Sequence, residues 1–171
     1  MKTTHINHNV LKVQLIIAAL PFLIANCDRS EQLLPPDQPL VGTVWKLEGF
    51  GSPDTSALII PQPVSEYNYQ LLLESGGNAY GKSSVNHMAG KYMCDEEKRT
   101  LGIDMQVLTY ALDTPDGQLY IERLSKIYRY EMQGDILRLY HPEGYLQYRP
   151  AGDNASFREK ITGLFGETGW L

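Results

Sequence analysis

The eight residues from Gly76 to Ser83, GGNAYGKS, have the spacing in this chain that most suggests chemistry. They match G-x-x-x-x-G-K-[ST], in which backbone amides surround nucleotide phosphates, the lysine reaches the β- and γ-phosphates and the hydroxyl binds magnesium. Such a loop must follow a strand and open a helix, but Gly90 follows Ser83 too closely for that helix. The downstream segments also lack repeated βαβ units. We therefore interpret the string as a glycine-rich hairpin turn.

Metal-ligating residue types gather just after this string. The candidates between residues 87 and 97 are His87, Cys94, Asp95, Glu96 and Glu97. Their spacing matches no zinc pattern, so we expect a surface histidine and a solvated acidic turn. Residues 113–117, DTPDG, begin like a calcium-binding loop, but Leu124 occupies the position that needs a glutamate. We interpret this segment as the entry to a helix.

Candidate nucleophiles have no convincing partners in the sequence. A thiol–imidazole pair of Cys94 and His87 would be chemically reactive, but a single thiol on a strand is more often packed as a small apolar side chain. Ser83 and Ser84 have no evident base and acid beside them. We therefore predict that the protein is not an enzyme, with no catalytic residue, no cofactor-binding residue and no metal ligand.

The chain begins with a segment typical of an export signal. Two lysines precede the apolar run VQLIIAALPFLI, residues 13–24, which is shorter than the roughly 20 residues that a bilayer span needs. The run ends in IANC, which resembles the lipobox of bacterial lipoproteins, although Asn26 departs from the small residue expected there. We predict a lipoprotein signal peptide over residues 1–26 and a lipid anchor on Cys27.

This signal places the protein in the bacterial cell envelope, attached to a membrane through Cys27. The outer membrane is favoured over the inner one, although Asp28 after the anchor is the residue that retains lipoproteins at the inner membrane of enteric bacteria. The net charge of −5 and the lack of a Lys/Arg stripe argue against nucleic acid as a partner. An exported domain meets no ATP, which further weakens a nucleotide site in the Gly76–Ser83 string.

The remaining sequence divides into a tether, one domain and a tail. Residues 27–40 are polar and rich in proline, and we expect them to form a lipidated, flexible tether. The folded domain is expected over 41–150, and a short helix is predicted in the tail, 151–171. Alternating apolar residues predict strands over 43–50, 67–74, 79–85, 90–94, 100–104, 128–132, 136–140 and 145–149, with an apolar continuation over 105–112 and a Pro-rich loop over 52–63.

One helix is expected inside the domain. Thr114 can cap it, Pro115 suits its first turn, and Tyr120, Leu124 and Ile127 recur at helical spacing. Many antiparallel strands with one helix predict an α+β domain, and closing the sheet into a barrel-like ring would remove its exposed edges.

The order of several short motifs resembles the META domain, also called the HslJ-like family, over about residues 41–150. The matching residues are Val44-Trp45-Lys46-Leu47, Leu71-x-Leu73, Gly76-Gly77, Gly81, Asn86, Gly90, Tyr92, Leu101-x-Ile103 and Thr109. The family often has Gly-Cys where Ser84-Val85 stands here, so its cysteine pair is absent. The resemblance implies a cracked antiparallel barrel with one packed helix, in an envelope protein linked to heat shock, antibiotic tolerance or secretion, with no known catalytic residues.

Together these observations predict a non-catalytic envelope lipoprotein that acts as a binding or accessory module in envelope stress or secretion. Its partner would be a hydrophobic ligand or an envelope protein. The alternatives are a lipocalin-like binder of small molecules or lipids and, less favoured, a hydrolase. Gly81 and Gly90 are expected at tight bends or close backbone approaches, and Asn86 is expected to fix its loop through hydrogen bonds to the backbone.

Overall fold

The computed structural model describes residues 39–152 and 154–165 of the 171-residue chain. The predicted signal peptide, Cys27 and most of the tether lie outside these residues, so lipidation remains a prediction. No helix in the described ranges is both long and apolar enough to cross a bilayer. The strands are β1 Val44–Ser52, β2 Thr55–Ile59, β3 Gln70–Glu74, β4 Asn78–Lys82, β5 His87–Asp95, β6 Thr100–Val107, β7 Arg129–Gln133, β8 Ile136–His141 and β9 Gly144–Pro150.

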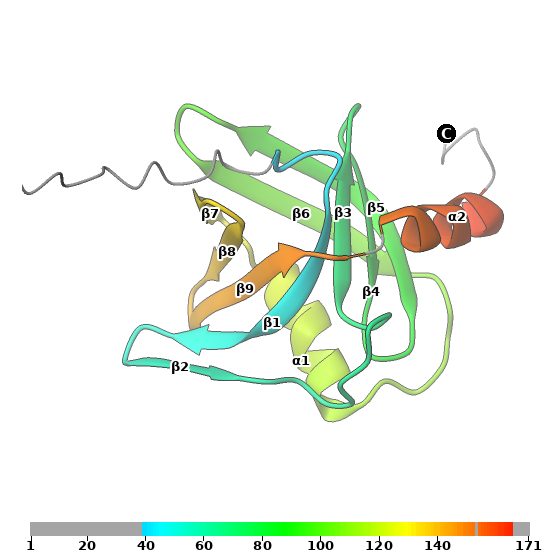
Figure 1. The fold of residues 1–171 in the computed structure, drawn as a ribbon, viewed down its shortest axis with the longest axis horizontal. Coiled ribbons are helices and arrows are strands. Elements are labelled where there is room, and N and C mark those ends of the chain that lie inside the picture. Colours follow the sequence, from blue (N-terminus) through cyan, green and yellow to red (C-terminus); the bar gives the residue numbers. More distant parts are fainter. Residues whose placement is uncertain (1–38, 153, 166–171) are drawn as a thin grey trace, which may run out of the picture. The chain divides into compact units, whose positions relative to one another are not determined.

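All nine strands belong to one antiparallel sheet that curls into a ring (Figure 1). The ring closes because β1 pairs with β9 along one edge, while its other edge is shared by β3 at its start and β2 at its end. β6 and β7 share a single residue pair, Thr100 with Arg129, so the ring is almost open there. The predicted fold class, a mostly antiparallel α+β domain with a cracked, barrel-like sheet, is confirmed.

The inside of the ring holds the main hydrophobic core. Alternation along each strand directs one side chain in two inward, and the inward set includes Trp45, Leu71, Leu137 and Tyr148, each with no exposed surface. The indole Nε1 of Trp45 donates to the backbone oxygen of Leu40 at 3.0 Å, which fixes the chain as it enters β1.

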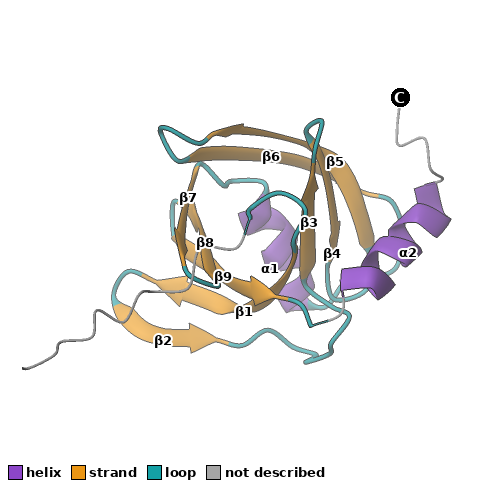
Figure 2. Cartoon of the chain, turned by 45° about the horizontal axis from the view of Figure 1, so that its top comes forward, coloured by secondary structure: helices purple, strands orange, loops and turns teal. Residues whose placement is uncertain are grey.

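Helix α1, Pro115–Leu124, covers one end of the ring (Figure 2). As predicted, Thr114 is its N-cap, accepting a hydrogen bond from the backbone N–H of Gly117, and Pro115 stands in the first turn. Tyr120 and Leu124 are buried in the main core. The Tyr120 hydroxyl lies 3.3 Å from that of Tyr148, which ties the helix to β9.

Helix α2, Asn154–Phe165, packs on the outside of the sheet, so the structure has two packed helices where one was expected. Phe157 and Ile161 form a second buried cluster with Val44, Leu72, Tyr80 and Ala89 of the outer sheet face. The sequence predicted a short helix in the tail. In the structure this helix packs on β1, β3, β4 and β5.

Three local predictions were wrong. The segment expected as a Pro-rich loop contains β2, an edge strand exposed on both faces, which therefore has no apolar alternation. β3 begins only at Gln70, because Tyr69 has a φ of 54° that interrupts the strand. The apolar continuation after residue 104 leaves β6 at Val107 and becomes a loop in which Tyr110 is 97% exposed.

Candidate functional site

The Gly76–Ser83 string is the β3–β4 hairpin, as predicted. Gly76 and Gly77 form its turn with φ values of 86° and 80°, a region that costs glycine little. Gly81 and Lys82 lie in β4, which is paired with β3 on one side and β5 on the other. The backbone amides after the turn therefore form hydrogen bonds within the sheet. The next element is the strand β5, so no helix N-terminus lies there to bind a phosphate.

Ser83 and Ser84 are held by a carboxylate from a distant loop. Their hydroxyls donate to Oδ1 of Asp113 at 2.5 and 2.6 Å, and the backbone N–H of Val85 donates to the same oxygen at 3.2 Å. Burial alone would raise the pKa of Asp113, but these bonds and one from Asn86 outweigh it, so its pKa is lowered. Both serine hydroxyls are thus occupied by a structural bond.

Asn86 secures the same two loops, which confirms its predicted role. Its side-chain nitrogen donates to the backbone oxygen of Ala111 at 2.7 Å and to Asp113, while its oxygen accepts from Thr109 and from the N–H of Ala111. We call Ser83, Ser84, Asn86 and Asp113 the Asp113 network. It joins the β4–β5 loop to the segment that leads into α1.

The structure separates the residues that could have formed a metal or thiol site. His87 begins β5 and Cys94 stands near its end, so their Cα atoms lie roughly 23 Å apart at about 3.3 Å per residue. The Cys94 side chain packs against the main core, and burial raises the pKa of its thiol. Within the part of the chain that the structure describes, no three His, Cys, Asp or Glu residues come together as metal ligands would.

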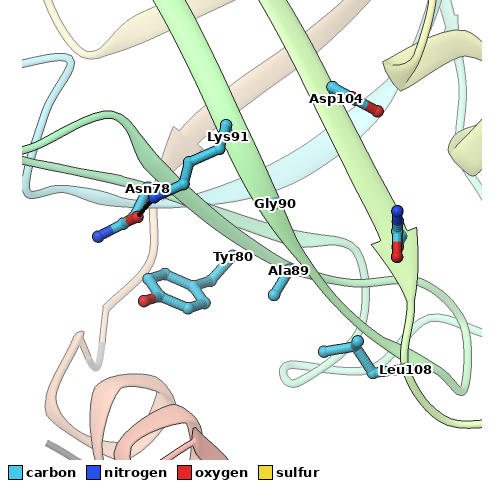
Figure 3. Close-up of a pocket in the computed structure, with 8 residues that line it drawn as sticks. Asn78, Tyr80, Ala89, Gly90, Lys91, Asp104 and Leu108 are labelled. Carbon is cyan, nitrogen blue, oxygen red and sulfur yellow. Dashed lines mark hydrogen bonds between the residues drawn. The ribbon is translucent and has the colours of Figure 1, made fainter. Parts of the chain in front are cut away.

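An open depression lies on the outer face of β4, β5 and β6, which we call the outer groove (Figure 3). Its volume is about 200 Å³. Tyr80 of β4, Ala89 of β5 and Leu108, just after β6, form its apolar floor, and polar side chains form its rim. The lining residues are Asn78, Tyr80, Ala89, Gly90, Lys91, Asp104, Gln106 and Leu108.

The close approach of β5 and β6 shapes this groove. A Cβ on Gly90 would lie 1.9 Å from the backbone oxygen of Asp104, so only glycine fits there. This confirms the predicted close approach. Gly81 has a milder version, since a Cβ there would lie 3.0 Å from the Met88 side chain. On the rim, Lys91 Nζ donates to the side-chain oxygen of Asn78 at 2.6 Å (Figure 3).

The outer groove was not among the predicted sites. A signal was present, because Tyr80 and Ala89 are apolar on the sheet face opposite the main core, together with Leu108 just after β6. Strands with apolar residues on both faces are covered on both faces. Here α2 covers only part of the outer face, and the groove is the part left open.

Comparisons with known proteins show solved structures with a similar fold. No protein-family model matches the chain, and no curated protein matches it. Among solved structures, the chain is similar to a DUF4847 family protein from Bacteroides vulgatus, with a TM-score of 0.50 and 16% identity over 67% of this chain and 96% of that one. It is also similar to a protein from Burkholderia xenovorans, with a TM-score of 0.53 and 24% identity over 67% of this chain and 85% of that one. At these identities the likeness is one of fold.

Proposed function

We propose that the protein is a non-catalytic accessory module of the bacterial cell envelope, anchored through an acylated Cys27, that binds a protein partner at the outer groove. The observation that carries this proposal is an open groove with an apolar floor and a polar rim on a domain whose interior is filled. The resemblance to the META domain adds the setting, which is envelope stress or secretion.

The filled interior favours a partner on the outside over a lipocalin-like ligand within. Trp45, Tyr120 and Tyr148 come from three different elements and occupy the middle of the ring with no exposed surface. A barrel that holds a ligand needs an open centre. The bulk of these aromatic side chains argues against that alternative.

The size of the outer groove favours a protein over a small molecule. Sites for drug-sized ligands usually enclose about 300–1,000 Å³, and this groove offers about 200 Å³. That volume suits one or two anchoring side chains of a larger partner. Apolar anchors surrounded by polar rim contacts are the usual anatomy of a protein interface.

Site-specific photo-crosslinking in intact cells tests the groove. A photoreactive residue at exposed Asp104 should give a discrete adduct, and the same residue at exposed Ser56 on β2 should not. The added change Gln106→Trp, which fills the groove from its rim, should abolish the adduct. Equal adducts from both positions, or an adduct that survives Gln106→Trp, would refute binding at this groove.

Metabolic labelling with a fatty acid tests the anchor. The wild-type chain should take up the label and fractionate with membranes, whereas Cys27→Ser should do neither. Cys94→Ser is the matched control, because that thiol packs against the core, and it should label like the wild type. A mature amino terminus upstream of residue 27 would disprove the anchor.

A further inference from the structure

A second groove follows the edge of β7, where the ring is almost open. It lies between the β5–β6 turn and the β7–β8 hairpin and has a volume of about 560 Å³. We call it the edge groove, and its lining shares no residue with the outer groove. The lining residues are Lys98, Arg99, Arg129, Tyr130, Glu131, Met132, Gln133, Ile136 and Arg138.

The backbone along this edge is available for pairing. In β7 the N–H of Tyr130 donates to the backbone oxygen of Arg99 at 3.0 Å, so even-numbered residues direct their N–H and C=O away from β8. The next such residue is Met132, beyond the single β6–β7 residue pair. No strand in the described ranges pairs with Met132 on that side. An extended segment could therefore add to the sheet here.

The charge of the edge groove is opposite to that of the whole chain. The chain carries a net charge of −5, yet four cations and one carboxylate line this groove. The carboxylate, Glu131, is already occupied, since it accepts from Arg129 at 2.9 Å and from the Tyr140 hydroxyl at 2.6 Å. Glu131 therefore does little to neutralise the other cations of the groove.

Among the cations that line the edge groove, Arg99 makes the fewest interactions. Its side chain makes no hydrogen bond or ion pair with any residue that the structure describes, and its guanidinium lies 5.9 Å from the ring centre of Tyr130. Its φ is 55°, a conformation that favours glycine over a side chain. Arg138, by contrast, donates to Gln147 at 2.9 Å and lies over the Tyr145 ring, which holds it in place.

We propose that the edge groove binds an acidic, extended polypeptide segment, which adds as a strand to β7. Acidic residues on the outer face of that strand would meet Arg129 and Arg138, and an acidic residue at its end beside the β5–β6 turn would meet Arg99, whose guanidinium lies near the Tyr130 ring. Residues on the other face would be apolar and would lie beside Met132, which packs against the core. The segment thus alternates acidic and apolar residues.

Fluorescence anisotropy with labelled peptides and the full chain in detergent tests this proposal. The acidic peptide EVEVEVE should bind, and KVKVKVK should not. Methylating alternate backbone nitrogens of the acidic peptide keeps its charge and removes its main-chain donors, and should weaken binding about tenfold or more. Equal binding of the methylated peptide would overturn strand addition.

Two protein variants complete the test. Arg99→Glu should weaken peptide binding about tenfold, whereas Lys91→Glu, the same charge reversal at an exposed residue of the outer groove, should change it less than twofold. Met132→Pro removes the free edge donor and should abolish binding. Failure of the acidic peptide to bind, or Arg99-dependent binding to phosphatidylglycerol vesicles in its place, would overturn the proposal.

Discussion

The Asp113 network and the edge groove both gather polar side chains where strands end, but they use them differently. In the Asp113 network, one carboxylate receives hydrogen bonds from Ser83, Ser84, Asn86 and the backbone of Val85. In the edge groove, Arg99 makes no such bond within the described residues. The polar groups of the Asp113 network are used in hydrogen bonds that hold two loops together. The charge of Arg99 in the edge groove is left for a binding partner.

This difference shows why residue types alone mislead. Serine, aspartate and asparagine at close spacing suggest chemistry, yet here each one has a structural partner. Arginine in an exposed turn suggests only solubility, yet its position beside an unpaired strand edge gives it a possible partner. The informative quantity is the number of polar groups left without a partner, which depends on tertiary structure.

Breaking the Asp113 network should have the largest effect on stability. Asp113→Ala leaves several donors without an acceptor and should lower the free energy of unfolding by about 3 kcal/mol, measured by urea denaturation at pH 7. Because the pKa of Asp113 is lowered by folding, its stabilisation is present above about pH 4 and is lost at lower pH. The difference in the free energy of unfolding between Asp113→Ala and the wild type should therefore decrease as the pH falls below about 4.

Asp104→Ala is the control for this measurement. Asp104 is exposed on β6, so its replacement should change the free energy of unfolding by less than about 0.5 kcal/mol at either pH. A similar loss of stability in both variants would mean that the network contributes nothing specific.

Crowding the network with one methyl group should have an intermediate effect. In Gly117→Ala the new Cβ would lie 2.3 Å from the Ser84 hydroxyl oxygen and 2.7 Å from Asp113 Oδ1. The resulting displacement should cost about 1–2 kcal/mol, after a partial gain in helix propensity. Gly102→Ala is the matched control, because its Cβ would meet nothing within 4 Å, and the two melting curves should differ clearly.

Lys46, near the same end of the ring, should make stability depend on alkaline pH. It donates to the backbone oxygens of Ser65, at 2.6 Å, and of Asn68. Burial, and then the charge of Lys82, lower the pKa of Lys46 to about 8. Between pH 8 and about 10.4 the unfolded chain binds more protons at this residue than the folded one, so the free energy of unfolding should rise with pH.

Comparing wild type with Lys46→Met at pH 7.5 and 9.5 isolates this contribution. The wild type should gain stability relative to the variant at the higher pH. The exposed Lys91→Met serves as the control and should track the wild type at both values. An unchanged difference between wild type and Lys46→Met would contradict the altered protonation of Lys46.

Removing the unfavourable backbone conformation of Arg99 should have the smallest effect on stability. Unlike the changes at Asp113 and Gly117, it should raise the free energy of unfolding. Because its φ of 55° suits glycine, Arg99→Gly should raise the free energy of unfolding by about 0.5 kcal/mol while it weakens binding of the acidic peptide. Urea denaturation and anisotropy on the same sample measure both. A loss of stability would show that this arginine is part of the structure, as Asp113 is.

The elements set by local sequence were predictable. Thr114 and Pro115 marked the start of α1, and the paired glycines at 76 and 77 marked the β3–β4 turn. These signals depend on neighbours in the chain. The strand β2 gave no such signal, because an edge strand exposed on both faces needs no apolar alternation.

The candidate sites could not be predicted because they depend on distant pairings. Asn86 was expected to fix a loop, but its partner Asp113 comes from another loop. The edge groove exists only because β6 and β7 separate after one residue pair, and no local pattern marks that separation. Docking of α2 likewise decides which part of the outer sheet face remains open.

The pairing of β1 with β9 has a consequence for how the protein reaches its final state. Glu48 and Arg149, joined at 2.6 Å across this pair, lie 101 residues apart in the sequence. During synthesis β1 is made early, but its pairing with β9 has to wait until nearly all of the domain has been made. Such long-range closure is slow, so we expect the β1–β9 pairing to form late in folding, after the hairpins between strands that are neighbours in the sequence.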